Sequence, residues 1–163
     1  MGKKRTENEA IKIIDSNKKA RHDYEIISSL EAGIVLLGSE VKSVRKGGIN
    51  LKESYIGFRS GECFLIGCHI SPYKFTSAVD APNPLRDRKL LLNRREIERM
   101  AMEVKRGGLT IVPLKVYFNT DGRAKLEIAL GKGKKLYDKR EDVKRRDAER
   151  EMKSASKQGR VKK

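Results

Sequence analysis

The stretch LTIVPLKVYFNTDGRAKLEIAL, residues 109–130, decides the fold class of this chain. Two runs rich in β-branched, aromatic and other apolar residues, 109–118 and 124–130, flank the segment NTDG at 119–122, which is typical of a hairpin turn. Pro113 lies in the first run, and because proline has no N–H for a strand ladder, it indicates an edge position or a bulge. The stretch therefore predicts an antiparallel β-hairpin.

Further strands are predicted on the N-terminal side of this hairpin. Residues 24–29 have a strand-like composition and precede the apolar run 34–37. Residues 55–58 and 63–66 flank Ser60-Gly61, the link of a second short hairpin. Five or six antiparallel strands in this order suit a small barrel, and barrels of the OB type often bind oligonucleotides.

Short helices accompany the strands. Asn93 followed by Glu96 resembles a capping box, and Gly107-Gly108 ends the helix that this box begins. The apolar stripe of that helix is Ile97, Met100, Ala101 and Val104. A shorter helix is predicted over residues 39–45, with Ser39 as its cap. The expected fold is therefore mainly β with short helices (β+α), arranged as an antiparallel barrel of the OB type.

Composition divides the 163 residues into three zones and indicates a polyanionic partner. Residues 1–16 are polar, residues 17–130 supply nearly all strand-forming and core-forming side chains, and residues 131–163 are basic and poor in apolar residues. The chain has 38 Lys and Arg against 22 Asp and Glu, a formal net charge of +16. Such an excess is typical of proteins that bind nucleic acid or an anionic membrane. No segment approaches the ~20 apolar residues of a membrane span, and none resembles a secretory signal, so we expect a cytosolic nucleic-acid-binding protein.

Chemistry at cysteines or carboxylates is not expected. Cys63 and Cys68 are an odd number of residues apart, so on one strand they face opposite sides, and His69 adds only a poorly placed third ligand. We expect two reduced, packed cysteines and no metal or cofactor. Glu31 and Glu40 are conceivable as an acid–base pair, but nothing in their spacing requires it. The sequence contains no nucleophile elbow or metalloprotease motif, and the chain is not expected to be an enzyme.

The basic tail, residues 131–163, has 14 Lys and Arg and 6 Asp and Glu, half of the excess charge of the chain. Its few apolar residues form no continuous stripe, so we expect it to be disordered alone. Acid-before-base pairs such as Glu141 with Arg145 give modest helix support, so part of it is expected to be helical on a polyanion. Its segment GKGKK at 131–135 lets the backbone approach phosphates, and Tyr137 offers a face for base stacking.

Two further basic segments lie within the central zone. Residues 17–24, NKKARHDY, combine cations with an amide, an imidazole and a phenol, which suits phosphates and unpaired bases. Residues 86–89, RDRK, form another cationic loop. A carboxylate in such a basic face, Glu31, can accept from a cytosine or guanine edge, or be an ordinary strand-end carboxylate. For His22 an ordinary surface histidine is the simpler interpretation.

Three motifs resemble the small protein B family, the tmRNA-binding proteins of bacterial trans-translation. These are GSEVKS at 38–43, RKLLL at 88–92 and GKGKKLYDKR at 131–140, and the resemblance extends from about Asn17 to Arg150. It implies an OB-type barrel with flanking helices, without catalysis or a small-molecule substrate. It also implies that the protein binds the tRNA-like part of tmRNA and brings it to stalled ribosomes, where the tail occupies the decoding centre and the empty mRNA channel. The alternative is a general single-strand or ribosomal RNA-binding protein.

The resemblance also implies two sets of site residues. The RNA-facing set is Asn17, Lys18, Arg21, His22, Tyr24, Glu31, Leu91, Asn93 and Lys125. The ribosome-facing set in the tail is Lys132, Gly133, Lys134, Lys135, Tyr137, Asp138, Lys139 and Arg140. Tyr137 stands where family members often have histidine, which keeps stacking but not an imidazole hydrogen bond. Read locally, Leu91 is only a core residue and Asn93 only a helix cap.

Overall fold

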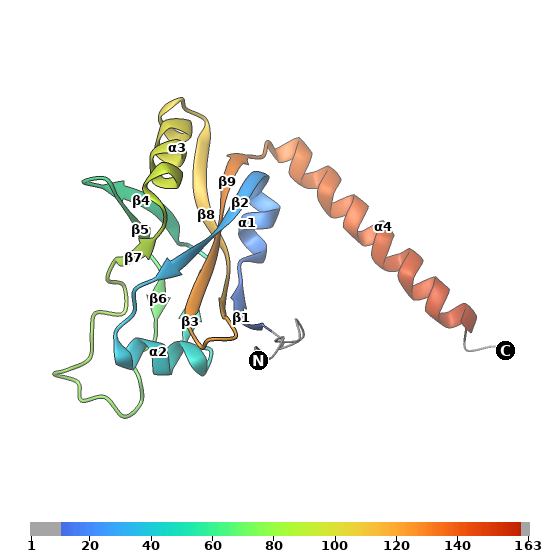
Figure 1. Ribbon diagram of the computed structural model, residues 1–163. Coiled ribbons are helices and arrows are strands. Elements are labelled where there is room, and N and C mark those ends of the chain that lie inside the picture. Colours follow the sequence, from blue (N-terminus) through green and yellow to red (C-terminus); the bar gives the residue numbers. More distant parts are fainter. Residues whose placement is uncertain (1–10, 161–163) are drawn as a thin grey trace, which may run out of the picture.

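A computed structural model describes residues 11–160 of the protein, with side chains to residue 157 (Figure 1). Residues 1–10 of the predicted N-terminal zone and residues 161–163 of the tail lie outside the described part. The elements in chain order are β1 (Lys12–Ser16), α1 (Lys18–Asp23), β2 (Tyr24–Ile34), α2 (Gly38–Arg45), β3 (Ile49–Asn50), β4 (Tyr55–Arg59), β5 (Glu62–Ile66), β6 (His69–Ile70), β7 (Arg88–Leu91), α3 (Arg94–Lys105), β8 (Leu109–Phe118), β9 (Ala124–Gly133) and α4 (Leu136–Arg160).

The main sheet is antiparallel and has seven strands in the order β1-β8-β9-β2-β7-β5-β4. The short strands β3 and β6 pair separately. The long strand β2 pairs with β9 along most of its length and with β7 only at its end, at Gly33 and Ile34. The prediction of a mixed β+α fold is confirmed.

The predicted barrel needs correction, because the sheet is open. Its two edge strands, β1 and β4, are not paired with each other, although the sheet curls until β4 lies near β8. Register shifts bend the strands between Ile13 and Asp15, between Ile26 and Ser28, and between Pro113 and Lys115. Alternation in a sequence predicts which residues form strands, but closure depends on how the edges of the sheet meet.

Both predicted hairpins are present. Strands β8 and β9 pair from Phe118–Ala124 back to Leu109–Lys132, and Gly122 in their turn has a φ of 75°. Strands β4 and β5 pair around Ser60 and Gly61, whose φ values are 50° and 74°. Of the two positions offered for Pro113, the structure selects the bulge, since β8 lies between β1 and β9 and is not an edge strand.

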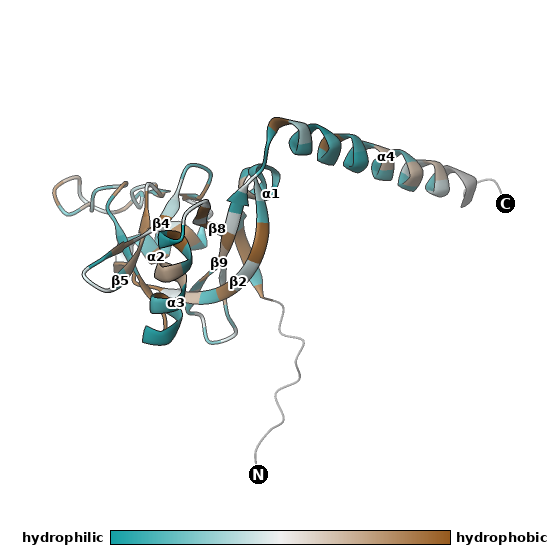
Figure 2. Cartoon of the chain, turned by 90° about the horizontal axis from the view of Figure 1, so that it is seen from above, coloured by the Kyte–Doolittle hydropathy of each residue, from teal (hydrophilic) through white to brown (hydrophobic). Residues whose placement is uncertain are grey.

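The hydrophobic core lies on the concave side of the sheet. Its fully buried side chains include Leu65 on β5, Leu90 on β7, Val116 on β8 and Leu126 on β9. Helix α3 adds Met100, with Ile97 and Val104 beside it, as the predicted stripe required. Figure 2 shows this apolar colouring concentrated on the strands, while α4 is largely hydrophilic. Cys63 and Cys68 are free and buried, as expected from sequence, and burial raises the pKa of each thiol to about 12.

Three boundaries differ from the sequence-based prediction. Residues 12–16, assigned to a polar segment outside the barrel, form β1 and pair with β8. Residues 18–23, assigned to a basic patch, form helix α1, which is too short for periodicity to reveal. Strand β9 continues to Gly133 because Lys132 and Gly133 pair with β2, so the sheet extends into the predicted tail.

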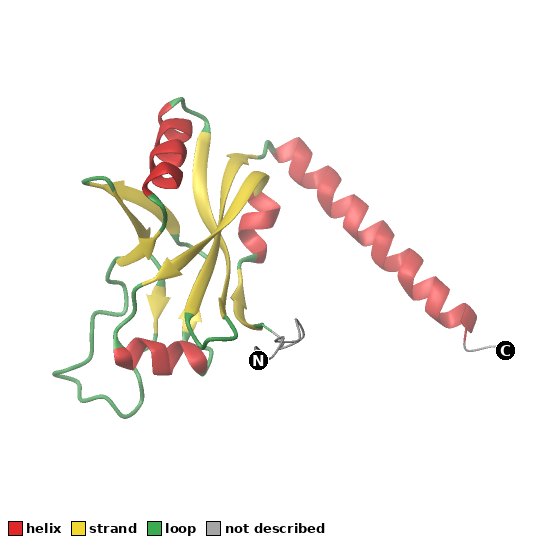
Figure 3. Cartoon of the chain, viewed as in Figure 1, coloured by secondary structure: helices red, strands yellow, loops and turns green. Residues whose placement is uncertain are grey.

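From Leu136 to Arg160 the tail forms one continuous helix, α4, of 25 residues, which projects away from the sheet (Figures 1 and 3). Its apolar side chains are largely exposed, Tyr137 by 70% and Met152 by 72%. A helix without packing partners is only marginally stable in water. The structure thus gives the conformation of the ordered tail, and disorder of the free tail stays a prediction. None of the helices within residues 11–160 is long and apolar enough to cross a membrane.

Candidate nucleic-acid interface

Three residues of the predicted RNA-facing set share the outer face of the sheet, on β2, β7 and β9. Gly33 is the Cα partner of Lys125 on one side and of Leu91 on the other. Glu31 lies two residues before Gly33 on the same strand and therefore faces the same side. The inward neighbours in β9, Leu126 and Ile128, are fully buried in the core. Strand pairing therefore places Glu31, Leu91 and Lys125 on one surface.

Glu31 is held in place by two neighbours and remains open to solvent. The Tyr117 hydroxyl donates a hydrogen bond to Oε2 of Glu31, and Nζ of Lys125 lies 3.6 Å from Oε1. Burial, together with this hydrogen bond to the carboxylate, raises the pKa of Tyr117 well above its usual value, so the phenol stays a donor. The side chain of Glu31 is 52% exposed. A fixed, accessible carboxylate is the acceptor that an exocyclic amino group of a base requires.

Leu91 and Asn93 extend this surface toward α3. Leu91 is 55% exposed and its side chain lies against Gly33, where an added Cβ would come within 3.2 Å of Cβ of Leu91. The local interpretation of Leu91 as core is therefore wrong. Asn93 is the N-cap of α3, and its backbone N–H donates to Oε2 of Glu96 at 3.0 Å. Asn93 is exposed, so its role as a cap is compatible with contact to RNA.

Helix α1 packs on the same outer face and presents cations. Ala20 is buried with Val112, Leu114 and Ala129, which fixes the helix over β8 and β9. Lys18 and Arg21 are exposed on its outer side.

Asn17, the N-cap of α1, is buried and holds the helix to two other segments. Its Oδ1 accepts from the N–H of Ala20 at 3.0 Å, and its Nδ2 donates to the carbonyls of Leu51 and Pro113 at 3.0 and 3.1 Å. Its backbone N–H donates to the carbonyl of Leu114 at 2.7 Å. These bonds occupy the amide of Asn17, so its side chain positions α1. A direct contact of Asn17 with RNA, which the family resemblance implies, stays a prediction.

The end of α1 meets the beginning of the tail at Asp23. One carboxylate oxygen of Asp23 lies 2.9 Å from Nδ1 of His22 and 3.3 Å from Nζ of Lys139. The hydrogen bond with His22, followed by that with Lys139, lowers the pKa of Asp23. Tyr24 begins β2 and is partly buried against the cluster under α1.

Residues of the predicted tail set occupy different environments. Lys132 and Gly133 belong to the sheet, and Lys134 and Lys139 form ion pairs with Asp142 and Asp23. Lys132 and Gly133 are exposed at the end of β9, and Lys135, Tyr137, Asp138 and Arg140 are exposed on or next to the first turn of α4.

The cationic loop at 86–89 is not a simple RNA-facing patch. The side chain of Arg88 is fully buried, and its guanidinium donates to Oε1 of Glu40 at 2.8 and 3.1 Å. Arg86 also donates to the Glu40 carboxylate, whose second oxygen accepts from the N–H of Leu37 at 2.9 Å and caps α2. Although burial raises the pKa of Glu40, the hydrogen bonds from Arg86, Leu37 and Arg88 outweigh it and lower that pKa. Glu40 is therefore a structural carboxylate that does not meet Glu31.

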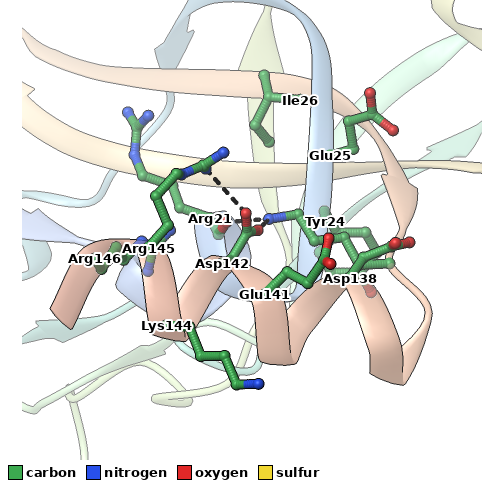
Figure 4. A pocket seen from close by; sticks show the side chains of 11 residues that line it. Arg21, Tyr24, Glu25, Ile26, Asp138, Glu141, Asp142, Lys144, Arg145 and Arg146 are labelled. Carbon is green, nitrogen blue, oxygen red and sulfur yellow. Dashed lines mark hydrogen bonds and ion pairs between the residues drawn. The ribbon is translucent and has the colours of Figure 1, made fainter. Parts of the chain in front are cut away.

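Sequence reasoning missed Tyr117 and Asp142. Alternation along 109–118 and 124–130 places Tyr117 and Lys125 on the outer face. The contact of Tyr117 with Glu31 can be predicted from this alternation only if the pairing of β2 with β9 is known. Asp142 was not singled out, because no local pattern in the sequence predicts its contact with Lys134, eight residues earlier (Figure 4). Within the described residues there is no cluster of His, Cys, Asp and Glu suited to a metal ion.

A family model described as SmpB protein matches residues 14–158. The chain belongs to the SmpB family. It is 55% identical to the SsrA-binding protein of Enterococcus hirae over 141 residues, which cover 86% of this chain and 90% of that relative. It is 50% identical to the SsrA-binding protein of Microcystis aeruginosa over 151 residues, covering 93% and 97%. The family resemblance seen in the sequence is confirmed.

The fold has a relative of known structure in the same family. A chain in the structure described as "tmRNA-SmpB: a journey to the center of the bacterial ribosome" superposes with a TM-score of 0.63 and 45% sequence identity. The match covers 76% of this chain and 85% of that one.

Proposed function

We propose that this chain is an SsrA-binding protein: it binds the tRNA-like part of tmRNA and acts with the ribosome in trans-translation. The carrying observation is its membership of the SmpB family over residues 14–158, with SsrA-binding relatives about half identical along nearly their whole length. A member of this family is a non-enzymatic RNA-binding protein. The net charge of +16 and the exposed cations of α1 are consistent with an RNA partner.

The two ends of the molecule take different parts in this function. The outer face of the sheet and α1 form the surface that selects the RNA, through the accessible members of the predicted set. These are Lys18, Arg21, His22, Tyr24, Glu31, Leu91, Asn93 and Lys125, with Asn17 positioning α1. Helix α4 and the residues before it enter the decoding centre and the empty mRNA channel. The projection of α4 away from the sheet supports this division (Figure 1).

The open sheet provides the RNA-binding surface that was expected of an OB-type barrel. Its curled shape presents one convex face, on which α1 lies, and keeps the core on the other. The protein acts in the cytoplasm, where ribosomes stall, and needs no membrane, cofactor or small-molecule substrate.

Gel shifts at one fixed salt concentration test the proposal. The probes are the tRNA-like fragment of tmRNA, an elongator tRNA and a random RNA of equal length. We expect the first to bind at least tenfold more tightly than the third, with affinity that persists as salt rises, because base and shape contacts are less salt-dependent than phosphate contacts. Equal affinity for the three RNAs would support a general RNA-binding protein and refute the proposal.

A further inference from the structure

Two aromatic rings and two lysines form a cluster beside α2, which lies at the end of the sheet opposite to the start of α4 (Figure 1). The rings are those of Tyr73 and Phe75, in the segment 71–87 that joins β6 to β7. Their centroids are 5.5 Å apart. Nζ of Lys46 lies 5.1 Å and 5.6 Å from the centres of the two rings, and Nζ of Lys42 lies 5.5 Å from that of Tyr73. We call these four residues the aromatic–lysine cluster.

Hydrogen bonds hold this segment against the end of α2. The N–H of Ser71 donates to the carbonyl of Gly48 at 2.8 Å, and the hydroxyl of Ser43 donates to the carbonyl of Ser71 at 2.6 Å. The N–H of Thr76 donates to the carbonyl of Tyr73 at 2.9 Å, which closes a four-residue turn. The two rings are therefore carried by a turn that is fixed beside α2.

The two lysines lie on one side of α2 because they are four residues apart, Lys42 in the last turn and Lys46 at the C-cap. Arg45 has a different neighbour, and its guanidinium lies 5.2 Å from the centre of the Phe118 ring. A cation at the C-terminal end of a helix stabilises that helix through its dipole. This effect accounts for cations at the end of α2, but it does not require an exposed aromatic ring beside them.

The ring of Phe75 is open to solvent. Phe75 is 76% exposed, whereas Phe58 and Phe64 are partly buried and Phe118 is buried. Phe75 therefore contributes little to the core. Proteins that bind single-stranded RNA use exposed rings of this kind as surfaces on which bases stack, next to cations that contact the phosphates. The aromatic–lysine cluster has both of these components in contact with each other.

Two of the three carboxylates on α2 and in the segment with the rings are paired within the protein. Glu40, the only carboxylate on α2, is 2% exposed and pairs with Arg88 in the interior. Asp87 pairs with Arg59 at 2.5 Å. The third carboxylate, that of Asp80, is exposed, and so are both lysines of the cluster. The accessible charge of this part of the surface is therefore mainly positive, which favours an anionic ligand.

We propose that the aromatic–lysine cluster is a second RNA-binding site, in which an unpaired base stacks on Phe75 while Lys42 and Lys46 contact the neighbouring phosphates. None of its residues belongs to the RNA-facing or the ribosome-facing set predicted from the family resemblance. A phosphate carries a net charge, so it attracts each ammonium group more strongly than the face of a ring does. The inference rests on the proposed function only in that the ligand is RNA.

Fluorescence tests the stacking directly. The chain contains no tryptophan, so Phe75→Trp adds a single reporter and keeps an aromatic ring at the site. Val79→Trp is the matched control, because Val79 lies in the same segment, is 93% exposed and is outside the cluster. A base that stacks on an indole quenches its fluorescence, so F75W should lose most of its emission at saturating RNA and V79W should lose little. Equal quenching of the two variants, or no quenching of F75W, would overturn the inference.

Affinity and its salt dependence give a second readout. Phe75→Ala should lower the RNA affinity about tenfold, as expected for the loss of one base–aromatic stack, and Val79→Ala should leave it unchanged. Lys46→Ala should reduce the slope of log K against log salt by about 0.7, the contribution of one phosphate contact to a single strand. Lys105→Ala, which removes an exposed cation from the last turn of α3, should not change that slope. Equal losses of affinity in F75A and V79A, or equal slopes in K46A and K105A, would contradict the proposed site.

Two sources of RNA are compared in separate arms. One arm uses the tRNA-like fragment of tmRNA and the other uses isolated small ribosomal subunits, and the arm in which F75W is quenched identifies the RNA. A benzophenone amino acid in place of Phe75 is then photocrosslinked in that arm. A crosslink to RNA supports the inference, and a crosslink to a ribosomal protein alone overturns it. Equal affinity of the wild type for all RNAs would refute the proposed function separately, because quenching of F75W can still be measured with random RNA.

Discussion

Replacing Glu40 by Gln removes the single carboxylate that neutralises two arginines inside the molecule. Glu40 is 2% exposed and Arg88 is not exposed at all, whereas Arg86 is 29% exposed. Arg86 can therefore turn toward water in the variant, but Arg88 cannot. The substitution leaves the Arg88 guanidinium buried next to an amide, whose single oxygen accepts but carries no charge.

The expected loss in the free energy of unfolding is about 3 kcal/mol. Breaking a buried ion pair by removing one partner costs about 3–5 kcal/mol, because the remaining charge is uncompensated. The lower end applies here, since the amide oxygen of the E40Q variant still accepts one hydrogen bond, and Arg88 keeps its bonds to the carbonyls of Cys68 and Pro84. With a urea m-value of about 2 kcal/mol/M, the midpoint of unfolding should fall by about 1.5 M.

Urea unfolding at pH 7, followed by circular dichroism, measures this shift. Glu53→Gln is the control, because Glu53 is 71% exposed and its ion pair is with the exposed Lys19, so the midpoint of this variant should not change measurably. The pKa of Glu40 is lower in the folded protein than its usual 4.5, so its contribution is present above pH 4.5 and is lost as the pH falls through the folded value. E40Q should therefore lose less stability than the wild type between pH 6 and pH 3. A midpoint equal to that of E53Q would refute the reasoning.

Three further outcomes are expected. Glu31→Gln should weaken binding of the tRNA-like fragment about tenfold although it raises the net charge. Glu103→Gln, which removes a carboxylate of α3 that pairs with Arg106, should not weaken it. Tighter binding by E31Q would show that the carboxylate accepts from no base. Truncation after Gly133, which keeps β9 whole, should preserve binding of that fragment and abolish tagging on stalled ribosomes; a loss of binding in proportion to the charge removed would contradict the division of roles. Amides of α4 beyond Arg145 should exchange with solvent far faster than those of β8, as seen by NMR, and slow exchange along the whole helix would show a tail that is ordered without a partner.

Regular patterns in the sequence predicted the parts of the fold that depend on local chemistry. The NTDG turn, the Ser60-Gly61 link and the stripe of α3 are each determined by residues a few positions apart, and each is present. Strand β1 was missed because KIIDS neither alternates nor extends beyond five residues. Its pairing with β8 depends on the edge that β8 offers, which is a property of the assembled sheet.

The site was predicted mainly through resemblance, and the geometry changes the meaning of some residues. Glu31, Leu91 and Lys125 are distant in sequence and are brought together by the pairing of β9, β2 and β7, which no local pattern specifies. Asn17 and Arg88 are residue types that often contact RNA, yet both are buried and make hydrogen bonds within the protein. Polar side chains in a basic segment do not reveal from sequence which of them face inward, because that depends on partners far along the chain.

The length of α4 turns its base into a pivot. At 1.5 Å per residue, a helix of 25 residues reaches about 37 Å, so a tilt of about 20° at the junction displaces its far end by about 13 Å. The ion pairs of Asp23 and Asp142 thus determine how large a volume the C-terminal end of α4 can occupy before it binds a partner. Small changes at the base of α4 should alter the association rate of its C-terminal end with a channel in a larger particle. They should not alter the affinity of that end once it is bound.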